Sequence, residues 1–364
     1  MRFIFGGMML AYLGGNIYIF VRALQTLAGH SIAIKIVFSV LFWLAALAMF
    51  IAFGARDAAL PATLMKALHS VGTAWLVFTL YMVLALLLCD IARLIIPQFR
   101  YGFWYALGFT IVILIYGHIN YLNPKIINLD ITLNKPIAGG PMKIVAISDI
   151  HLGEGTGKRQ MKKYAELINA QNPDIILIAG DLIDNSVTPL YREQMQEELS
   201  ILKAPMGVYM VAGNHEYISG IEKSAQFLAN TPVTLLRDTI ISLPNGVQII
   251  GRDDKSNRHR RELEDMMAEA NAAQPIIVMD HQPYNLHKSD SLKVDLHLSG
   301  HTHRGQVWPA SLLTDKMYEQ SYGYRKWSHS HIFVSSGLSL WGPPFRIGTN
   351  SDMAVINLKG SEAE

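Results

Sequence analysis

Charged residues are scarce in this chain, and cysteine is almost absent. Of its 364 residues only 16% are Asp, Glu, Lys or Arg, whereas 51% are hydrophobic, and the formal net charge is +2. So small an excess of positive charge implies no general attraction to nucleic acid, and we expect no nucleic-acid binding. A single cysteine, Cys89, excludes a disulfide within one chain and leaves the cellular compartment open.

The missing charge is concentrated in the first third of the chain. Four long apolar runs contain no Asp, Glu, Lys or Arg: Phe3–Val21, Ile36–Phe53, Val71–Cys89 and Tyr101–Leu122. Each is close to the length that a helix needs to cross about 30 Å of hydrocarbon. We therefore predict a four-helix transmembrane domain over residues 1–123, a linker with an edge strand over 124–141, and a second domain over 142–364. Because the runs carry no buried charge, we interpret them as an anchor rather than a transporter.

The basic residues that flank the four runs do not set an orientation. One side carries Arg2, Arg56, Lys66 and Lys125, and the other carries Arg22, Lys35, Arg93 and Arg100. An even number of spans puts the N-terminus and the second domain on the same side of the membrane. The positive-inside rule leaves open whether that side is the cytoplasm.

Beyond the linker, strand-like segments alternate with helical patterns. Helical spacing of apolar residues predicts helices over Lys158–Asn172, Leu190–Leu202 and Ile221–Ala229. Such alternation indicates βαβ units. After Pro232 the β-strand character increases, at Val233–Leu236, Val247–Ile250, Ile332–Ser335 and Met353–Leu358. The sequence therefore predicts an α/β domain with a β-rich second half.

Polar residues stand at the C-terminal ends of five predicted strands, where open α/β sheets bind ligands. These residues are Asp149 and His151, Asp181, Asn214 with His215, His281, and His301 with His303. Residues at positions i and i+2 share one face of a strand, so Asp149 and His151 can reach the same ion. The seven of these residues other than His215 are too many donors for one metal ion and about right for two. Carboxylate and imidazole donors without thiolate suit Mn, Fe or Zn.

The motifs Asp-x-His, Gly-Asp, Gly-Asn-His-Glu, His and Gly-His-Thr-His occur in this order between Asp149 and His303. In type and order they resemble the motifs of the calcineurin-like metallophosphoesterases, and within them the membrane-associated or exported bacterial branch. The resemblance covers about residues 142–358. It implies a four-layer α/β/β/α sandwich and a metal-dependent phosphoric ester hydrolase, either a phosphodiesterase or a phosphatase. It also implies an integral, multi-pass protein of the bacterial cytoplasmic membrane.

The resemblance also implies a role for each motif residue. One metal ion would be held by Asp149, His151, Asp181 and His303, and the second by Asp181, Asn214, His281 and His301. Asp181 would then bridge two divalent ions, Mn first and otherwise Fe, Zn or another metal, which would activate a hydroxide. His215 is the catalytic position, which we assign to stabilising the transition state and protonating the leaving oxygen.

Several other residues keep two interpretations at this stage. Arg304 stands where many relatives carry glycine; its guanidinium either holds a substrate phosphate or points away. Asp184, Glu216 and Asp280 either orient site residues or are simple loop or strand-end acids. The basic run 252–261 either meets an anionic head group or is a solvated face. The aromatic segment Gln306–Trp327 either packs over the sheet or forms a lid, an acyl-chain groove or a membrane-docking face.

The leading hypothesis is a membrane-anchored phosphoesterase that acts on a phospholipid or a lipid-linked head group, with the lipid bilayer itself as a partner. A second hypothesis keeps the chemistry but assigns a soluble phosphodiester, a nucleotide or a wall precursor as the substrate. A third is a catalytically silent membrane scaffold, which the complete set of ligand residues disfavours. No oligomeric state is predicted.

Overall fold

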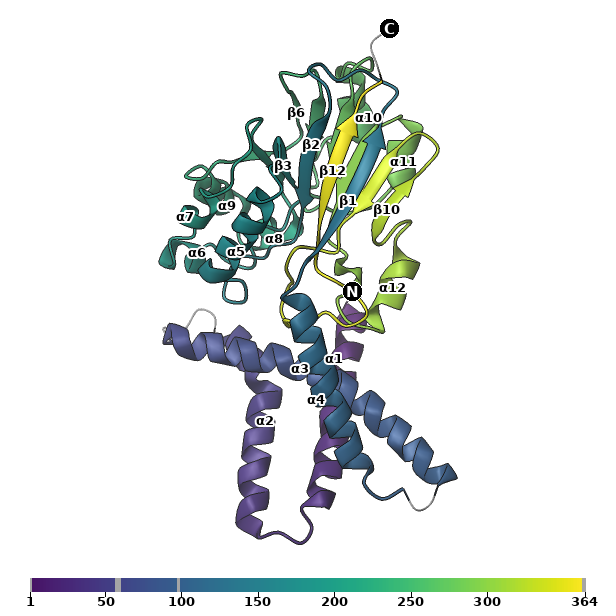
Figure 1. Cartoon of the computed structure of the whole chain (residues 1–364). Coiled ribbons are helices and arrows are strands. Elements are labelled where there is room, and N and C mark those ends of the chain that lie inside the picture. Colours follow the sequence, from purple (N-terminus) through teal and green to yellow (C-terminus); the bar gives the residue numbers. More distant parts are fainter. Residues whose placement is uncertain (1, 56–59, 97–98, 362–364) are drawn as a thin grey trace. The chain divides into compact units, whose positions relative to one another are not determined.

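The computed structural model describes residues 2–55, 60–96 and 99–361, which form two compact units. The first comprises the residues up to Asn120 together with Gly342–Ile347, and the second comprises Tyr121–Trp341 with Gly348–Glu364. Figure 1 shows the elements of each unit. The two units are described separately.

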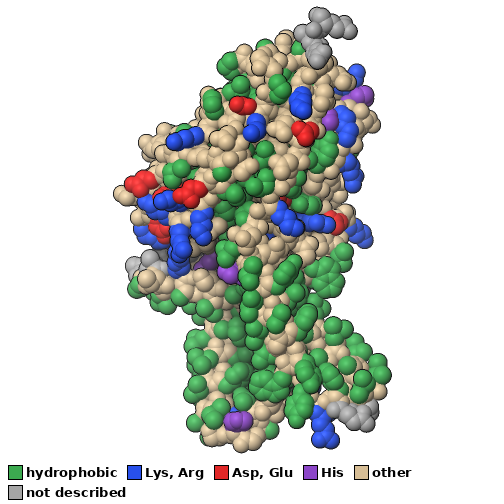
Figure 2. Space-filling view, viewed as in Figure 1, with side chains coloured by type: hydrophobic (Ala, Val, Ile, Leu, Met, Phe, Trp, Pro, Cys, Tyr) green, Lys and Arg blue, Asp and Glu red, His purple; other side chains and the backbone are tan. Residues whose placement is uncertain are grey.

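The first unit contains four long helices at the predicted apolar runs: α1 (Arg2–Thr26), α2 (Ile32–Gly54), α3 (Ala62–Ile95) and α4 (Gly102–Tyr121). Each is long and apolar enough to cross a membrane. Large apolar side chains point outward along them, for example Ile36, Leu94 and Val112, which are 56%, 85% and 67% exposed. Figure 2 shows hydrophobic side chains covering these helices, with few charged ones among them. Exposed apolar surface of this kind favours contact with lipid, and the structure contains the four long apolar helices that the sequence predicts.

Contacts between the four helices are local and specific. Ile19, Phe42, Met82 and Ala106, one from each helix, form a small buried cluster. Gly72 of α3 lies so close to α2 that an added Cβ would be 2.2 Å from the backbone nitrogen of Met49. Polar contacts also join α1 to α3: for example, the Asn16 amide oxygen accepts from the Trp75 indole at 2.8 Å, and Arg22 pairs with Asp90 at 2.7 Å. These groups satisfy one another within the unit, which agrees with a packing role for Asn16.

The segment Gly342–Ile347 belongs to this first unit although it is distant in sequence. The Arg346 backbone N–H donates to the carbonyl oxygen of Gly117 at 2.9 Å, and the Asn120 amide donates to the Arg346 carbonyl at 3.0 Å. His118 lies 3.0 Å from the carbonyl oxygen of Pro344. The end of α4 is thus held by the loop that precedes the last strand.

The second unit is built on two six-stranded sheets. The first sheet has the order β1-β12-β2-β3-β4-β5 and the second β10-β11-β9-β8-β7-β6. In the first, β12 runs antiparallel to β2 while β2 to β5 are parallel; in the second, β7, β8, β9 and β11 are parallel and the outer strands β6 and β10 are antiparallel. The strands are β1 (Lys125–Thr132), β2 (Met142–Ile147), β3 (Ile175–Ile178), β4 (Val208–Val211), β5 (Val233–Leu236), β6 (Thr239–Ser242), β7 (Gln248–Gly251), β8 (Ile276–Met279), β9 (Leu296–Ser299), β10 (Gly323–Lys326), β11 (His331–Val334) and β12 (Asp352–Lys359).

The alternation of side chains along the strands produces the layers. Ile144 of β2 and Leu177 of β3 share one buried cluster with Ile249 of β7 and Ile277 of β8, so the two sheets pack face to face. The neighbouring residues Val145 and Ile176 point to the opposite face of the first sheet and pack on its helices. Those helices are α5 (Lys158–Asn169), α6 (Thr188–Arg192), α7 (Gln196–Leu199) and α9 (Ile221–Leu228), which Figure 1 shows beside β2 and β3.

Helices also cover the outer face of the second sheet. Leu263 and Met266 of α10 (Leu263–Glu269) pack on Ile250 and Val278, and Leu286 of α11 (Leu286–Ser291) packs on β11. The remaining helices, α8 (Asn214–Ile218), the 3₁₀ turn η1 (His303–Gly305) and α12 (Ala310–Met317), follow strand ends or lie in the 306–327 segment. The order of layers is helix, sheet, sheet, helix, which confirms the predicted four-layer α/β/β/α sandwich.

Two local expectations change. The helix predicted over Leu190–Leu202 is broken into α6 and α7, because Gln194 between them has φ 54°, outside the right-handed helical region. Residues 124–141, expected as a linker with an edge strand, contain β1, which begins at Lys125 and pairs with β12 along its whole length. Much of that stretch is therefore sheet.

Candidate metal centre

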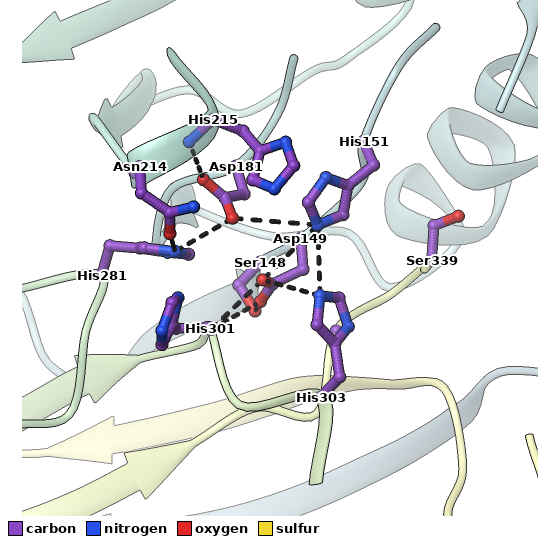
Figure 3. A network of polar contacts seen from close by, with 12 residues as sticks. Ser148, Asp149, His151, Asp181, Asn214, His215, His281, His301, His303 and Ser339 are labelled. Carbon is purple, nitrogen blue, oxygen red and sulfur yellow. Dashed lines mark hydrogen bonds and ion pairs between the residues drawn. The ribbon is translucent and has the colours of Figure 1, made fainter. Parts of the chain in front are cut away.

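The predicted ligands lie in the turns that follow β2, β3, β8 and β9, with Asn214 and His215 at the start of α8 after β4. Five of them have a left-handed backbone: Asp149, His151, Asp181, His301 and His303 have φ between 47° and 71°. Non-glycine residues rarely adopt this conformation, and such residues concentrate at functional sites. The turns direct these side chains towards one point, as Figure 3 shows.

Three glycines make this convergence sterically feasible. A Cβ on Gly213 would lie 2.1 Å from Asp181 Oδ1, and one on Gly300 would lie 2.3 Å from Asp149 Oδ2. Gly180 has φ 84°, and a Cβ there would lie 2.5 Å from the His281 ring. Any side chain at these positions would displace a predicted ligand.

The ligand atoms form two groups and a third one that links them. Asp149, His151 and His303 form the first group, Asp181, His281 and His301 form the second, and His151, Asp181 and His215 form the linking group, with the ligand atoms of each group within 4.8 Å of one another. Asp181 Oδ2 is 3.1 Å from His281 Nε2 and 3.8 Å from His151 Nε2, so it faces both groups. The Asn214 amide oxygen lies 3.2 Å from His281 Nε2 and so belongs to the second group. The structure thus brings together all seven predicted ligands.

Contacts behind the ligands fix their orientation. His281 Nδ1 lies 2.8 Å from the carbonyl oxygen of Ala179, to which it can only donate, so Nε2 is left to face the site. Asp181 Oδ1 accepts the backbone N–H of His215 at 2.9 Å, while its other oxygen points at the imidazoles. Asp149 accepts from the Ser148 hydroxyl and from the backbone N–H of His301. Ser148 and Ala179 were not singled out from the sequence, because nothing in their residue type signals this role.

The electrostatics of the centre favour bound cations. Burial opposes charge on His151, but its contacts with Asp149 and Asp184 outweigh burial and raise its pKa to about 10. Burial likewise opposes charge on His281, yet Asp181 holds the pKa of His281 well above the usual value. The carboxylates thus favour the protonated, positively charged form of these imidazoles. A divalent cation bound there would take the place of those protons. Imidazole, carboxylate and amide donors in two adjoining groups fit two divalent ions of the Mn, Fe or Zn type.

His215 lies at the edge of this centre and is 8% exposed. Its Nδ1 is 3.0 Å from Asp184 Oδ1, and its ring centroid is 4.5 Å from that of His151. Asp184 is itself buried, and although burial opposes its ionisation, its contacts with the two histidines lower its pKa to about 2. The Trp341 ring lies 6.3 Å from the His215 ring on another side. Asp184 therefore holds the His215 imidazole, and of its two interpretations the structure favours the orienting one.

Comparison with known proteins agrees with this geometry. Residues 142–305 match the profile of the calcineurin-like phosphoesterase family. An uncharacterized metallophosphoesterase of Campylobacter jejuni is 31% identical over 259 residues, which is 69% of this chain and 68% of that protein. The chain belongs to the calcineurin-like metallophosphoesterase family.

Two further relatives of this metallophosphoesterase illustrate its range. An uncharacterized metallophosphoesterase of Helicobacter pylori is 34% identical over 65% of this chain and 64% of its own length. A transmembrane protein with a metallophosphoesterase domain from Danio rerio is 30% identical over 70% of this chain and 62% of its own. The aligned part of the chain thus spans a little under two thirds of the length of these relatives.

Glu216, the last residue of the Gly-Asn-His-Glu motif, supports the metallophosphoesterase centre from behind. It is fully buried, and its carboxylate accepts the backbone N–H groups of Asp181, Ile183 and Gly213 at 3.1, 2.8 and 2.7 Å. It thereby joins the turn after β3 to the turn after β4. The sequence does hint at both acids, because Asp184 stands three residues after Asp181 and Glu216 stands two residues after Asn214. Residue type alone, however, does not distinguish them from ordinary loop acids.

Asp280 forms ion pairs with arginines of the basic run 252–261. Arg252 donates to Asp280 at 2.7 Å and Arg260 at 3.2 Å, and Arg252 is only 7% exposed. Arg261 pairs with Glu269. Much of the positive charge of this run is therefore neutralised within the unit, which argues against a head-group site there.

Arg304 lies outside the ligand groups. It follows His303 directly, and its guanidinium carbon is 4.8 Å from the centroid of the Tyr322 ring. Together with residues of the 306–327 segment it lines a cavity of about 290 Å³. The structure therefore directs Arg304 towards this neighbouring cavity.

Proposed function

We propose that this protein is a membrane-anchored, metal-dependent phosphoesterase that hydrolyses the phosphate ester of a phospholipid or a lipid-linked head group. The observation that carries the chemistry is the pair of Asp/His groups that Asp181 faces, at 3.8 Å from His151 and 3.1 Å from His281. Membership of the metallophosphoesterase family supports the same reaction class.

The residues at the centre divide into holding and proton-handling groups. We propose that Asp149, His151, Asp181 and His303 hold one divalent ion and that Asp181, Asn214, His281 and His301 hold a second, with Mn as the first choice. Bound there, two such ions would supply a water of lowered pKa and positive charge opposite the phosphoryl oxygens. His215, oriented by Asp184 at 3.0 Å, is placed to donate a hydrogen bond to the phosphoryl group and a proton to the leaving oxygen.

The connection between the two units supports a substrate held in the membrane. Only three residues separate the end of α4 at Tyr121 from the start of β1 at Lys125. Four Cα-to-Cα steps reach at most about 14 Å, so the chain connection between the two units is short. A head group in the same bilayer would meet this domain at a high effective concentration. Because the anchor is a multi-pass helical one, we propose the cytoplasmic membrane of a bacterium rather than an outer membrane, whose spanning proteins are barrels.

The 306–327 segment supports the same substrate class. On and before α12, Trp308, Leu312, Leu313 and Met317 are 49%, 61%, 60% and 59% exposed. Large apolar side chains exposed together indicate contact with lipid or another apolar surface. This exposure favours a membrane-docking role for the segment over close packing on the sheet.

The test is a turnover assay on the purified full-length protein in lipid nanodiscs supplied with Mn²⁺. Phosphate release and lipid mass spectrometry would follow phospholipids and lipid-linked precursors, with nucleotides and soluble phosphodiesters in parallel. Asp181→Asn is the inactive variant, and Asp130→Asn, at a side chain that is 72% exposed on β1, is its matched control. We expect metal-dependent lipid turnover that only Asp181→Asn abolishes. Turnover of soluble esters alone would refute the lipid assignment, and no turnover of any ester would refute the enzyme assignment.

A further inference from the structure

The cavity beside Arg304 has the size and chemistry of a binding site for a small polar group. It has a volume of about 290 Å³ and is lined by Arg304, Asp315, Tyr318, Glu319, Tyr322 and Arg325, among others. We call it the insertion pocket, because apart from Arg304 these residues belong to the 306–327 segment. Its volume suits a head-group fragment better than an acyl chain.

The carboxylates of the insertion pocket are already used by the protein. Asp315 accepts a hydrogen bond from the Ser321 hydroxyl. Glu319 accepts from the backbone N–H of His287 at 3.0 Å and pairs with its imidazole at 2.6 Å. These two acids are therefore directed to their own partners.

The two arginines, in contrast, have unused donors. Among the residues that the structure describes, neither Arg304 nor Arg325 forms a side-chain hydrogen bond or an ion pair, and Arg304 Nε is buried without an acceptor. A buried guanidinium N–H without an acceptor is costly unless a ligand supplies one. An anion in the pocket would supply an acceptor to Arg304 Nε, and the exposed Arg325 side chain could bind the same anion.

The backbone at and after Arg304 is constrained by local contacts. Arg304 has φ 48° and ψ 38°, and its backbone N–H donates to the Thr302 hydroxyl at 3.1 Å. The next residue, Gly305, has no room for a side chain, since a Cβ would lie 2.4 Å from the carbonyl carbon of Ala310. The guanidinium stacks on Tyr322, which leaves the N–H groups at its edge free to bind an acceptor in the guanidinium plane.

The insertion pocket adjoins the metal centre. Arg304 is the residue after His303, and the Tyr318 ring of the pocket lies 6.3 Å from the His301 ring. A molecule whose phosphoryl group lies among the Asp and His ligands can therefore extend its neighbouring part into the pocket.

We propose that the insertion pocket binds a second anionic group of the substrate, a phosphate other than the one that is hydrolysed. Two guanidinium groups can bind a phosphate through paired N–H donors, while the carboxylates of Asp315 and Glu319 in the same lining are directed to Ser321 and His287. This inference rests on the proposed function and narrows its substrate to esters that carry a further phosphate. That phosphate belongs either to a lipid head group or to a soluble ester.

The test compares matched esters that differ by one phosphate. The soluble pair is thymidine 5′-(4-nitrophenyl phosphate) and its 3′-phosphorylated form, and the lipid pair is phosphatidylglycerol and phosphatidylglycerol phosphate in nanodiscs. The variants are Arg304→Gln, Arg304→Lys and Arg325→Gln in the full chain. Arg261→Gln, which removes an arginine paired with Glu269 outside the pocket, is the matched control.

We expect Arg304→Gln and Arg325→Gln to lower kcat/KM for the phosphorylated ester about 10- to 100-fold, the loss of one charge-assisted hydrogen bond. The ester without the extra phosphate should change less than about twofold, and Arg304→Lys should restore part of the loss. The pair that shows this difference identifies the lipid or the soluble source. Equal losses on both members of a pair would overturn the inference, as would no loss on either.

A binding measurement keeps this inference separate from the proposed function. Methylenediphosphonate would be titrated into the full-length protein after removal of metal by a chelator, with binding followed by ³¹P NMR. We expect about 10-fold weaker binding in Arg304→Gln and Arg325→Gln and none of this weakening in Arg261→Gln. Unchanged binding in all variants would refute the pocket even if esters are hydrolysed. If no ester is hydrolysed while these binding differences appear, the enzyme assignment fails and the pocket stands.

Discussion

The glycines beside the two carboxylates allow the shared role of Asp181 to be tested with single methyl groups. In Gly213→Ala the new Cβ meets Asp181 Oδ1 at 2.1 Å, and in Gly300→Ala it meets Asp149 Oδ2 at 2.3 Å. Gly213 has φ −106°, and neither glycine has the positive φ that disfavours alanine. The new methyl group therefore pushes first on a carboxylate, and it also meets the Asp181 backbone nitrogen at 2.7 Å in Gly213→Ala and the Ser148 side chain at 2.4 Å in Gly300→Ala.

The required displacement is large for a metal ligand. A carbon and an oxygen without a hydrogen bond rarely approach closer than about 3.2 Å, so each carboxylate must move by roughly 1 Å. Metal–ligand distances tolerate only about 0.2 Å. Overpacking of this kind costs about 1–3 kcal/mol, less than the stability of a typical domain. We therefore expect folded variants with impaired metal binding.

The two variants should differ in metal stoichiometry. Because Asp181 faces both groups, Gly213→Ala should lose both ions, whereas Gly300→Ala should lose mainly the ion held by Asp149. Metal content per chain, measured by plasma mass spectrometry after dialysis, reports this directly, and circular dichroism confirms folding. Gly108→Ala is the matched control, since a Cβ there meets nothing within 4 Å. Two ions retained in Gly213→Ala would refute the assignment of Asp181 as the shared ligand.

Three further predictions concern other parts of the second unit. Asp184→Asn should lower kcat about 10- to 100-fold even where excess Mn²⁺ keeps the metal content unchanged, because His215 loses the carboxylate that orients it. Because Asp184 also lies 3.5 Å from His151, metal analysis accompanies the steady-state kinetics. Burial lowers the pKa of His297 to about 4, so between pH 6.5 and 4 the unfolded chain binds a proton that the folded chain does not. The free energy of unfolding therefore decreases as the pH is lowered through this window. In thermal melts, the Tm of His297→Gln should decrease less than that of the wild type over the same window. The double variant Leu312→Ser, Leu313→Ser should lower kcat/KM about tenfold on lipid esters only, measured against a soluble ester, because both side chains are exposed.

For each of these three predictions a specific result would contradict the reasoning. Loss of metal in Asp184→Asn would make Asp184 a support of the ligands rather than of His215. Parallel melting curves of wild type and His297→Gln from pH 7 to 4 would show that His297 titrates normally. Equal losses on lipid and soluble esters in the double leucine variant would show that α12 acts on the site and not on the bilayer.

The grouping of the candidate ligands was predictable because these residues occupy positions that the apolar periodicity marks. The runs before Asp149, Asp181 and His281 are short and apolar, so they read as buried strands, and parallel strands bring their C-terminal ends to one edge. The same reasoning found the four membrane helices, since an uncharged run of about 20 residues has few other uses. In both cases a pattern of neighbouring residues, repeated along the chain, is enough to predict the element.

Roles that depend on tertiary neighbours were harder to predict. Asp184 and Asp280 are both single acids near a ligand, yet one orients His215 while the other neutralises Arg252 and Arg260. Only the packing distinguishes them. The same holds for the break at Gln194, where the apolar spacing continues through a residue whose backbone leaves the helical region.

The position of β12 has a consequence for how the protein is made. This strand, Asp352–Lys359, lies between β1 and β2, so β1 has no other strand beside it in the sheet. During synthesis β1 leaves the ribosome directly after the fourth membrane helix, and its partner follows only after the whole chain between Thr132 and Asp352. At translation rates of about 5–20 residues per second, that interval lasts on the order of 10–40 s. For this time β1 lacks its neighbour in the first sheet, and the arrival of the last strand completes the sheet.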